Sequence, residues 1–332
     1  MTSAIKFLLF IGASLLLFLK CSVIKPFSVE ISEIPTPSEN PITAEKIAFG
    51  RKLFFDKRLS LNETVSCATC HVPKYAFTDR KKTSEGILGR TTTRNSPSIL
   101  NSAFLKTVMF DAHLPSLEMQ VIVPIQEHTE MGHNMKDLIQ KLRKIPEYQA
   151  EAKKIFNRDF DAYVLTRAIS AFERSLLSLN SRYDQFMRGN NSVLTTTEKA
   201  GMKLFTEKLY CIQCHPPPYF TTFEAQNNGL YKEFGEDKGR FRIHLDSADI
   251  GKFKIPSLRN IELTFPYMHD GTLTTIDEII NHYRKGGQGN PLQSKLIQPF
   301  EISTQEQKQL KAFLYALTDS SYMTEMNFRK RK

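Results

Sequence analysis

The residues of this chain that are best suited to chemistry are four cysteines and two histidines in two short stretches. VSCATCHVPK (65–74) and LYCIQCHPPP (209–218) each contain a CxxCH motif, and the two motifs consist of Cys67, Cys70 and His71 and of Cys211, Cys214 and His215. Two cysteines on one helical turn can each add to a vinyl group of a haem, and the histidine that follows can bind the iron. The motifs therefore predict two covalently bound c-type haems.

Zinc binding and dithiol redox chemistry are the alternatives for paired cysteines. A zinc ribbon joins two CxxC pairs across a gap of about 15–20 residues, but the gap between residues 70 and 211 is far longer. A thioredoxin-like redox pair needs a βαβ context, which the sequence lacks. The histidine that each motif carries favours haem.

Helical periodicity precedes both motifs. Apolar residues recur at helical spacing in 43–56, where Thr43 is a candidate N-cap, and in 195–208. Both segments contain Gly-x-x-Leu-Phe, as Gly50–Phe54 and Gly201–Phe205. This faint internal repeat of helix, loop and CxxCH indicates two related domains.

The rest of the chain also favours helices. We expect them at 134–145, 161–179 and 303–318, and no long alternating strand pattern is present. Long loops at 74–108 and 216–262 are typical of a chain that surrounds a large ligand.

We therefore predict a mainly α fold of two cytochrome c-like domains, each with one covalently bound haem. The expected boundaries are 43–190 for the N-terminal domain and 191–320 for the C-terminal domain, with a basic tail at 321–332.

The N-terminal segment predicts export. Lys6 followed by the apolar run 7–19 is typical of a signal peptide (1–20), and an uncleaved anchor is the alternative. Either interpretation places the remaining chain outside the cytoplasm, and we expect the periplasm. The stretch 21–42 holds four prolines and indicates a linker.

Cys21 lies directly after the expected signal, where a lipoprotein carries its lipid anchor. Lys20 before it does not match the small residues that precede a cleavage site, so the sequence leaves lipidation open.

The charge distribution limits the partners. The formal net charge is +10, but Lys and Arg form no stripe with interleaved aromatic residues, so we expect no nucleic acid. A mildly basic surface can dock an acidic protein, and an ordinary solvated surface is the alternative.

Three further stretches, GRTTTRNSPSILNSAF (89–104), MFDAHLPSLEMQVIVPIQEHTEMG (109–132) and KIPSLRNIELTFPYMHDGTLTTIDEIINHYRKGG (254–287), resemble the dihaem cytochrome c peroxidase/MauG family. The resemblance covers about 43–318. It implies that the N-terminal haem is the peroxide site, with His71 as its proximal iron ligand.

The resemblance also assigns the residues around that haem. Gln120, Pro124 and Glu130 fall on the family's distal-pocket positions. Glu130 would move a proton between the peroxide oxygens, with its pKa raised by an apolar pocket, and Gln120 would hold the bound oxygen. In many relatives a histidine after the first CxxCH fills the second axial position, but 72–112 hold none. We expect an open iron that needs no prior reduction. His113, His128 and His133 are the nearest histidines, and we expect none of them to bind the iron.

The C-terminal haem would be bound by His215 and by Tyr283, which lies fourteen residues after the histidine of His269–Gly271. A tyrosine ligand favours the higher oxidation states of iron, whereas the methionine of other members raises the potential. Met268 is the rival ligand. The family's tryptophan between the haems is replaced by Phe110, which is harder to oxidise, and the chain has no tryptophan.

Relatives also hold a calcium ion between the domains, and Asn95, Thr264 and Pro266 match its ligand positions. Oxygen ligands of this kind suit calcium, although a single side-chain ligand predicts weak binding.

We predict a dihaem peroxidase that reduces hydrogen peroxide to water with electrons from a small cytochrome c or cupredoxin-type protein. A MauG-like oxidase that modifies a protein substrate and a non-catalytic dihaem electron-transfer protein are the alternatives. The sequence leaves homodimerisation open.

Overall fold

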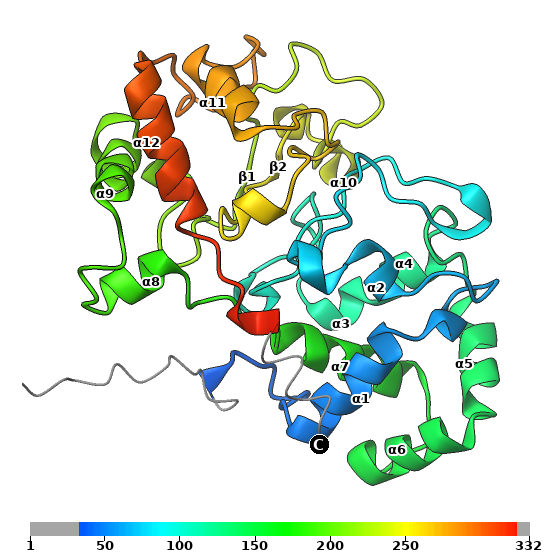
Figure 1. The fold of residues 1–332 in the computed structure, drawn as a ribbon. Coiled ribbons are helices and arrows are strands. Elements are labelled where there is room, and N and C mark those ends of the chain that lie inside the picture. The colour runs from blue at the N-terminus through cyan, green and yellow to red at the C-terminus, as the bar shows by residue number, and fades with distance from the viewer. Residues whose placement is uncertain (1–32, 324–332) are drawn as a thin grey trace, which may run out of the picture.

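The computed structural model describes residues 33–323. The predicted signal peptide, Cys21, most of the predicted linker and the last nine residues of the predicted tail lie outside this range. Two hydrophobic cores divide the described chain into two lobes (Figure 1). We call them the N-terminal half, whose core runs from Ile47 to Leu176 and also includes Tyr322, and the C-terminal half, whose core runs from Tyr183 to Leu317.

Helices form most of the regular structure in both halves, so the predicted mainly α class is confirmed. The N-terminal half contains α1 (Ala44–Phe54), α2 (Cys67–Cys70), α3 (Leu117–Gln120), α4 (Ile122–Gln126), α5 (Met135–Arg143), α6 (Pro146–Phe156) and α7 (Ala162–Arg174). The C-terminal half contains α8 (Arg182–Met187), α9 (Thr196–Lys203), α10 (Phe241–His244), α11 (Ile276–Arg284) and α12 (Thr304–Tyr315). The described strands are β1 (Ala225–Gln226) and β2 (Phe253–Lys254), which pair antiparallel.

The predicted helices form close to their expected positions because the sequence places capping residues at their N-termini. The hydroxyl of Thr43 accepts the backbone N–H of Lys46 at the start of α1, and Ser303 forms a capping box with Glu306 at the start of α12. The helix expected at 161–179 ends earlier, at Arg174, and the chain then turns toward the other half.

One glycine in each half allows two helices to cross at close range. A Cβ on Gly50 of α1 would lie 1.7 Å from the carbonyl oxygen of Ala168 in α7. A Cβ on Gly201 of α9 would lie 1.9 Å from the carbonyl oxygen of Gln309 in α12. The glycine of each Gly-x-x-Leu-Phe segment therefore has the same packing role, and the internal repeat of the sequence is also a repeat of structure.

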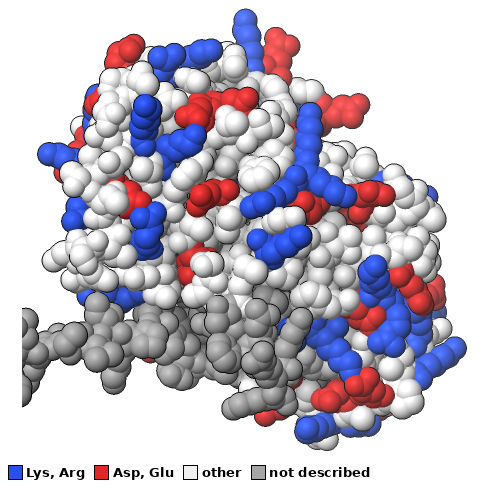
Figure 2. Space-filling model, viewed as in Figure 1, with Lys and Arg blue, Asp and Glu red and all other residues white. Residues whose placement is uncertain are grey.

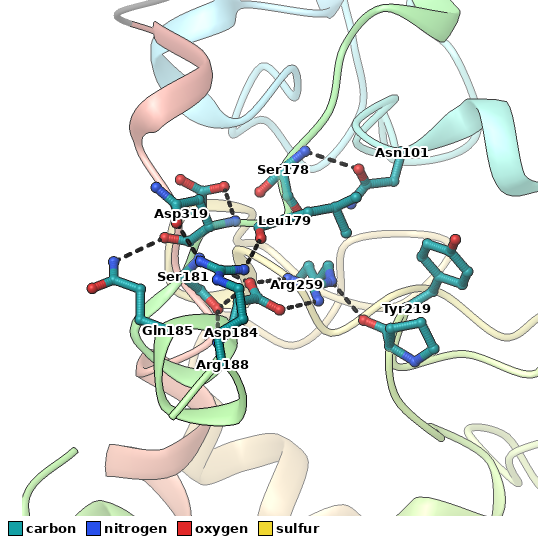
Figure 3. A network of polar contacts seen from close by, with 12 residues as sticks. Asn101, Ser178, Leu179, Ser181, Asp184, Gln185, Arg188, Tyr219, Arg259 and Asp319 are labelled. Carbon is teal, nitrogen blue, oxygen red and sulfur yellow. Dashed lines mark hydrogen bonds and ion pairs between the residues drawn. The ribbon is translucent and has the colours of Figure 1, made fainter. Parts of the chain in front are cut away.

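The connection between the halves is fastened to both of them (Figure 3). The backbone N–H of Ser178 donates to Oδ1 of Asn101 at 2.8 Å, and its hydroxyl accepts from Nδ2 of Asn260 at 2.7 Å. Asn101 and Asn260 both have left-handed backbones, with φ of 61° and 59°, and asparagine tolerates this conformation. The two asparagines are equivalent positions of the repeat that meet at one residue of the connection.

A buried ion pair holds the next part of the connection. The guanidinium of Arg259 donates to both carboxylate oxygens of Asp184 at 2.7 Å, and Ser181 donates to the same carboxylate (Figure 3). Arg259 also donates to the carbonyl of Pro218 at 2.8 Å. The start of α8 is thereby fixed to the loop that follows the second CxxCH motif.

Reciprocal contacts join the halves at their interface. The backbone N–H of Asn95 donates to the carbonyl of His269 at 2.8 Å, and that of Lys254 donates to the carbonyl of Phe110 at 2.6 Å. The end of the described chain returns to the N-terminal half, where the Tyr322 hydroxyl donates to the carbonyl of Pro73 at 3.1 Å. The two lobes therefore share an extensive polar boundary.

Lys and Arg are interspersed with Asp and Glu on the face that Figure 2 shows. This face carries no extended surface of a single charge. Among residues 33–323, no helix combines the length and the apolar character that crossing a membrane requires.

Candidate active site

The first CxxCH motif forms a short helix that fixes the imidazole of His71. Ser66 and Thr69 form a capping box around α2, and the N–H of His71 donates to the carbonyl of Cys67. Nδ1 of His71 lies 3.0 Å from the carbonyl oxygen of Phe77. A carbonyl only accepts, so Nδ1 carries the proton and Nε2 keeps its lone pair. Burial lowers the pKa of His71, which also favours the neutral ring that binds metals.

The predicted residues of the N-terminal site line one pocket. The pocket and its open mouth together hold about 500 Å³ of empty space, part of it open to solvent. Its lining residues are Val65, Ser66, Cys67, Cys70, His71, Gly86, Gln120, Val121, Pro124, Glu130, Met131, Ile169 and Glu173. Residues up to about 100 positions apart in the sequence thus face a common space.

Glu130 reaches this pocket from the loop after α4. The N–H of Glu130 donates to the carbonyl of Glu127 at 2.9 Å, and the N–H of Ile87 donates to the carbonyl of Glu130 at 2.9 Å. Burial, together with the neighbouring charge of Glu127, raises the pKa of Glu130 to about 7. A carboxyl with this pKa can accept and return a proton near neutral pH.

Gln120 and Pro124 come from the adjacent short helices. Ser116 caps α3 by accepting the N–H of Met119, and Gln120 is the last residue of that helix. Pro124 lies one turn further on in α4. The side chains of Val121, Met131 and Ile169 give the rest of the pocket an apolar wall.

Glu173 is a pocket residue that the sequence analysis did not single out. It lies on α7, one turn after Ile169, and is 5% exposed. The signal in the sequence was a carboxylate on the apolar face of a predicted helix, four residues after a buried isoleucine.

The second CxxCH motif repeats the arrangement of the first. Nδ1 of His215 lies 3.0 Å from the carbonyl oxygen of Phe220, so Nε2 again keeps its lone pair. Burial lowers the pKa of His215 to about 4. Burial also raises the pKa of the Cys211 thiol to about 12. None of the four cysteines of the described chain forms a disulfide.

Tyr283 and its rival Met268 meet at Asn228. The amide of Asn228 donates to the sulfur of Met268 at 3.3 Å and also bonds the Tyr283 hydroxyl. Burial raises the pKa of Tyr283 to about 12, and the charges that Cys214 and Cys211 would carry as thiolates add to the effect. Tyr283 therefore lies close to the second CxxCH motif.

The internal repeat makes Tyr283 equivalent to Pro124. Pro124 lies fourteen residues after Phe110, and Tyr283 lies fourteen residues after His269. Phe110 and His269 are themselves equivalent, because the segments around them share their backbone features. Met109 and Met268 have positive φ, and antiparallel bridges join Val108 to Leu114 and Tyr267 to Leu273. One half thus has a phenol where the other has a proline, which has no metal-binding atom in its side chain.

Phe110 lies at the boundary between the halves and not in the pocket. The guanidinium of Arg94 lies 6.0 Å from its ring and 5.3 Å from the ring of Phe253, which stacks on His269 at 3.7 Å. An aromatic series thus crosses the boundary without a tryptophan.

The remaining histidines near the first motif lie elsewhere. His128 is exposed and pairs with Glu127, and Nδ1 of His133 bonds the carbonyl of Asn134. Nδ1 of His113 is buried without a hydrogen-bond partner in the described chain. Of the residues that line the pocket, His71 is the sole histidine.

The predicted calcium ligands lie near the interface between the halves. The Asn95 amide donates to the carbonyl of Lys81 at 2.8 Å. Thr264 and Pro266 follow Leu263 in the chain, and the carbonyl of Leu263 accepts a hydrogen bond from Arg80 at 2.9 Å. Within 33–323, no three or more His, Cys, Asp or Glu residues cluster as a metal site. Calcium binding here would depend on the side-chain amide oxygen of Asn95 and on backbone oxygens of Thr264 and Pro266, close to the guanidinium of Arg80.

Comparison with known proteins decides the family. A family model described as "Di-haem cytochrome c peroxidase" matches residues 44–192. The chain is 36% identical to the "Methylamine utilization protein MauG" of Methylorubrum extorquens, over 86% of this chain and 81% of that protein. The chain belongs to the di-haem cytochrome c peroxidase family.

Other family members match it over similar lengths. "Cytochrome-c peroxidase IdrP1" of Pseudomonas sp. (strain SCT) is 32% identical over 86% of this chain and 84% of that protein. The solved structure of "a MauG-like protein associated with microbial copper homeostasis" has a TM-score of 0.81 and 34% identity, covering 91% of this chain and 96% of that one.

The family implies two c-type haems, and the residues present fit this group. Each half offers two free thiols and one imidazole whose Nδ1 is fixed by a carbonyl. In the N-terminal half these groups face a pocket with otherwise mostly apolar walls. Burial raises the pKa values of the Cys67 and Cys211 thiols, as expected of side chains packed in apolar surroundings.

Proposed function

We propose that this di-haem peroxidase reduces hydrogen peroxide to water in the pocket of the N-terminal half. The family and its named peroxidases make the protein an oxidoreductase that acts on peroxide. The observation that carries the proposed site is the common pocket of the first CxxCH motif, Gln120 and Glu130. We further propose a small cytochrome c or cupredoxin-type protein as electron donor.

In this proposal each half holds one haem. Cys67, Cys70 and His71 bind the first, and Cys211, Cys214, His215 and Tyr283 bind the second, through thioether bonds, the two Nε2 atoms and the phenol oxygen. When bound, the haems supply the redox chemistry and the site at which peroxide is activated. The support is the free lone pair of each histidine and the position of Tyr283 beside the second motif.

Glu130 moves a proton between the two peroxide oxygens. Cleavage of the O–O bond into water needs a proton on the departing oxygen, and the other oxygen carries one to give. The Glu130 carboxylate accepts that proton and returns it to the departing oxygen. Its pKa of about 7 makes both steps accessible near neutral pH.

Gln120 and the apolar wall complete the proposed site. The Gln120 amide donates a hydrogen bond that orients peroxide. Val121, Met131 and Ile169 surround the polar groups with apolar side chains, which strengthens both polar interactions by lowering the local dielectric constant.

Several predictions about the whole protein stay proposals. They are domains at 43–190 and 191–320, a periplasmic location after export by residues 1–20, and a weak calcium site at Asn95, Thr264 and Pro266. The two separate hydrophobic cores support the two-domain arrangement.

The proposed function is tested by peroxide-dependent oxidation of a reduced small c-type cytochrome by the purified dihaem protein. We expect two cytochromes to be oxidised for each peroxide, because H2O2 + 2e⁻ + 2H⁺ gives 2H2O. Absence of cytochrome oxidation, with both haems attached, would contradict the proposal.

Tyr283 favours a second candidate, a MauG-like oxidation of a protein substrate. A phenolate ligand stabilises oxidised iron, and a solved relative at 34% identity is named as MauG-like. A protein that consumes peroxide without oxidising the cytochrome, while a co-purifying protein gains a side-chain modification, would favour this candidate.

A further inference from the structure

Glu173 is a second carboxyl in the pocket that the mechanism above leaves without a role. It is 5% exposed, and its Oε2 is buried without any hydrogen-bond partner in the described chain. The residue lines the same pocket as Glu130, Gln120 and His71. A buried carboxylate oxygen without a partner is costly, so the carboxyl is most stable when it is protonated.

The charged groups around Glu173 do not neutralise it by pairing. Arg174, next in α7, directs its guanidinium to Glu118 of α3, where its NH2 group donates to Oε2 at 2.8 Å. From α2, the thiol of Cys67 faces the same region. From the turn at Ser102–Phe104, the Ser102 hydroxyl reaches only the backbone carbonyl of Glu173. Burial raises the pKa of Glu173 to about 8, Arg174 opposes this effect and Glu118 adds to it.

The reaction itself requires protons from outside the substrate. Each peroxide reduced to two waters consumes two electrons and two protons. Glu130 transfers a proton that peroxide already carries, so its cycle brings in none. A protonated carboxyl on the pocket wall can bring one in.

We propose that Glu173 supplies protons to this pocket during peroxide reduction, an inference that rests on the proposed function. The O–H bond of the Glu173 carboxyl breaks, its proton goes to an oxygen that leaves as water, and the resulting carboxylate takes a proton from solvent before the next turnover. The electrons come from the donor protein, so Glu173 itself is neither oxidised nor reduced.

The first test uses Glu173→Gln in the dihaem protein, which keeps the shape of the side chain but has no acidic proton. We expect the initial reaction with peroxide to stay within about twofold and kcat to fall about tenfold or more, since proton supply limits only the completed cycle. The kcat of the wild-type protein should fall as pH rises through about 8, where Glu173 loses its proton, and kcat of the variant should lack this step. Glu173→Asp should restore the step, and Glu147→Gln, an exposed carboxylate of the same half, should behave as wild type.

The second readout does not depend on turnover. Infrared spectra of the wild-type protein at neutral pH should contain a protonated-carboxyl band that disappears as pH rises through about 8 and that is absent in Glu173→Gln. If the wild-type protein turns over normally but Glu173→Gln keeps both the wild-type pH profile of kcat and the protonated-carboxyl band, this inference alone would be overturned. Failure of the wild-type protein to reduce peroxide would overturn both it and the proposed function.

Discussion

At the scale of single residues, environment divides the carboxyls around the pocket into two kinds. Burial alone would raise the pKa of Glu118, but hydrogen bonds from Arg174 and Asn40 lower it to about 2. Glu130 and Glu173 receive no such bonds, and burial raises their pKa values to about 7 and about 8. Glu118 therefore stays a structural anion, whereas the other two can carry protons.

Replacing Glu130 with glutamine should slow the reaction with peroxide by about 10²–10⁴-fold, the usual contribution of a positioned acid–base group. In the wild-type protein the rate should rise with pH through about 7, because only the carboxylate can accept the first proton. Rapid mixing with peroxide between pH 5 and 9 measures both effects. A Glu130→Gln variant that keeps the wild-type pH profile would contradict the role of Glu130.

Replacing Tyr283 with methionine should raise the reduction potential of the C-terminal haem, on the order of 0.1 V, because a thioether donates less charge than a phenolate. Potentiometric titration of the haem absorbance measures the change. Met268→Leu is the control for the rival ligand beside Asn228. If Met268→Leu changed the potential and Tyr283→Met did not, Met268 would be the ligand.

At the scale of elements, the internal repeat determines both the packing and the difference between the sites. The crossings of α1 with α7 and of α9 with α12 each depend on a glycine. If Tyr283 binds iron as proposed, its equivalence with Pro124 gives the C-terminal half a ligand that the N-terminal half lacks. In that proposal, the same scaffold presents an open position in one half and a closed one in the other.

Gly50→Ala should destabilise the protein by about 1–3 kcal/mol, because the added methyl group forces α1 away from α7. The clash is with backbone, the carbonyl oxygen of Ala168, which cannot move aside as a flexible side chain could. Gly235→Ala is the matched control, since a Cβ there meets nothing within 4 Å. Chemical denaturation of both variants measures the free energy of unfolding. Equal stability of the two variants would show that the crossing tolerates a side chain.

Local sequence signals predicted the elements that carry the motifs, and tertiary contacts determined the rest. The caps of α1 and α12 and the two CxxCH motifs depend on neighbouring residues, so spacing revealed them. Glu173 could not be placed in the same way, because its position in the pocket depends on α7 crossing α1 and facing α2. Asn228, which joins Met268 and Tyr283, lies in a loop with no regular pattern.

At the scale of the whole molecule, buried charges fasten the two halves together. Asp111 is fully buried and forms ion pairs with Arg94, at 2.9 Å, and with Arg242 of the other half. Arg94 also bonds Asp237 of the other half. Arg94 of this network also lies over the rings of Phe110 and Phe253, so the ion pairs and the aromatic series meet at the same boundary.

Asp111→Asn should lower the free energy of unfolding by about 1–3 kcal/mol, because it removes the buried negative charge that pairs with Arg94 and Arg242. Glu207→Gln, in an exposed pair with Lys203, should change it by less than about 0.5 kcal/mol. Thermal and denaturant unfolding of the haem-loaded proteins measures both. An Asp111→Asn variant as stable as the control would show that the network does not hold the halves together.

The central claim is that peroxide is reduced in the pocket of the N-terminal half. His71 is the sole histidine that lines this pocket. Because no second histidine is there to fill the other axial position of the iron, the enzyme should need no prior reduction. The most direct measurement mixes fully ferric protein with peroxide and reduced small c-type cytochrome, and compares it with protein reduced beforehand at the C-terminal haem. The account predicts immediate cytochrome oxidation without a lag and equal rates from both starting states. A lag or absence of turnover from the ferric protein, removed by prior reduction, would contradict it.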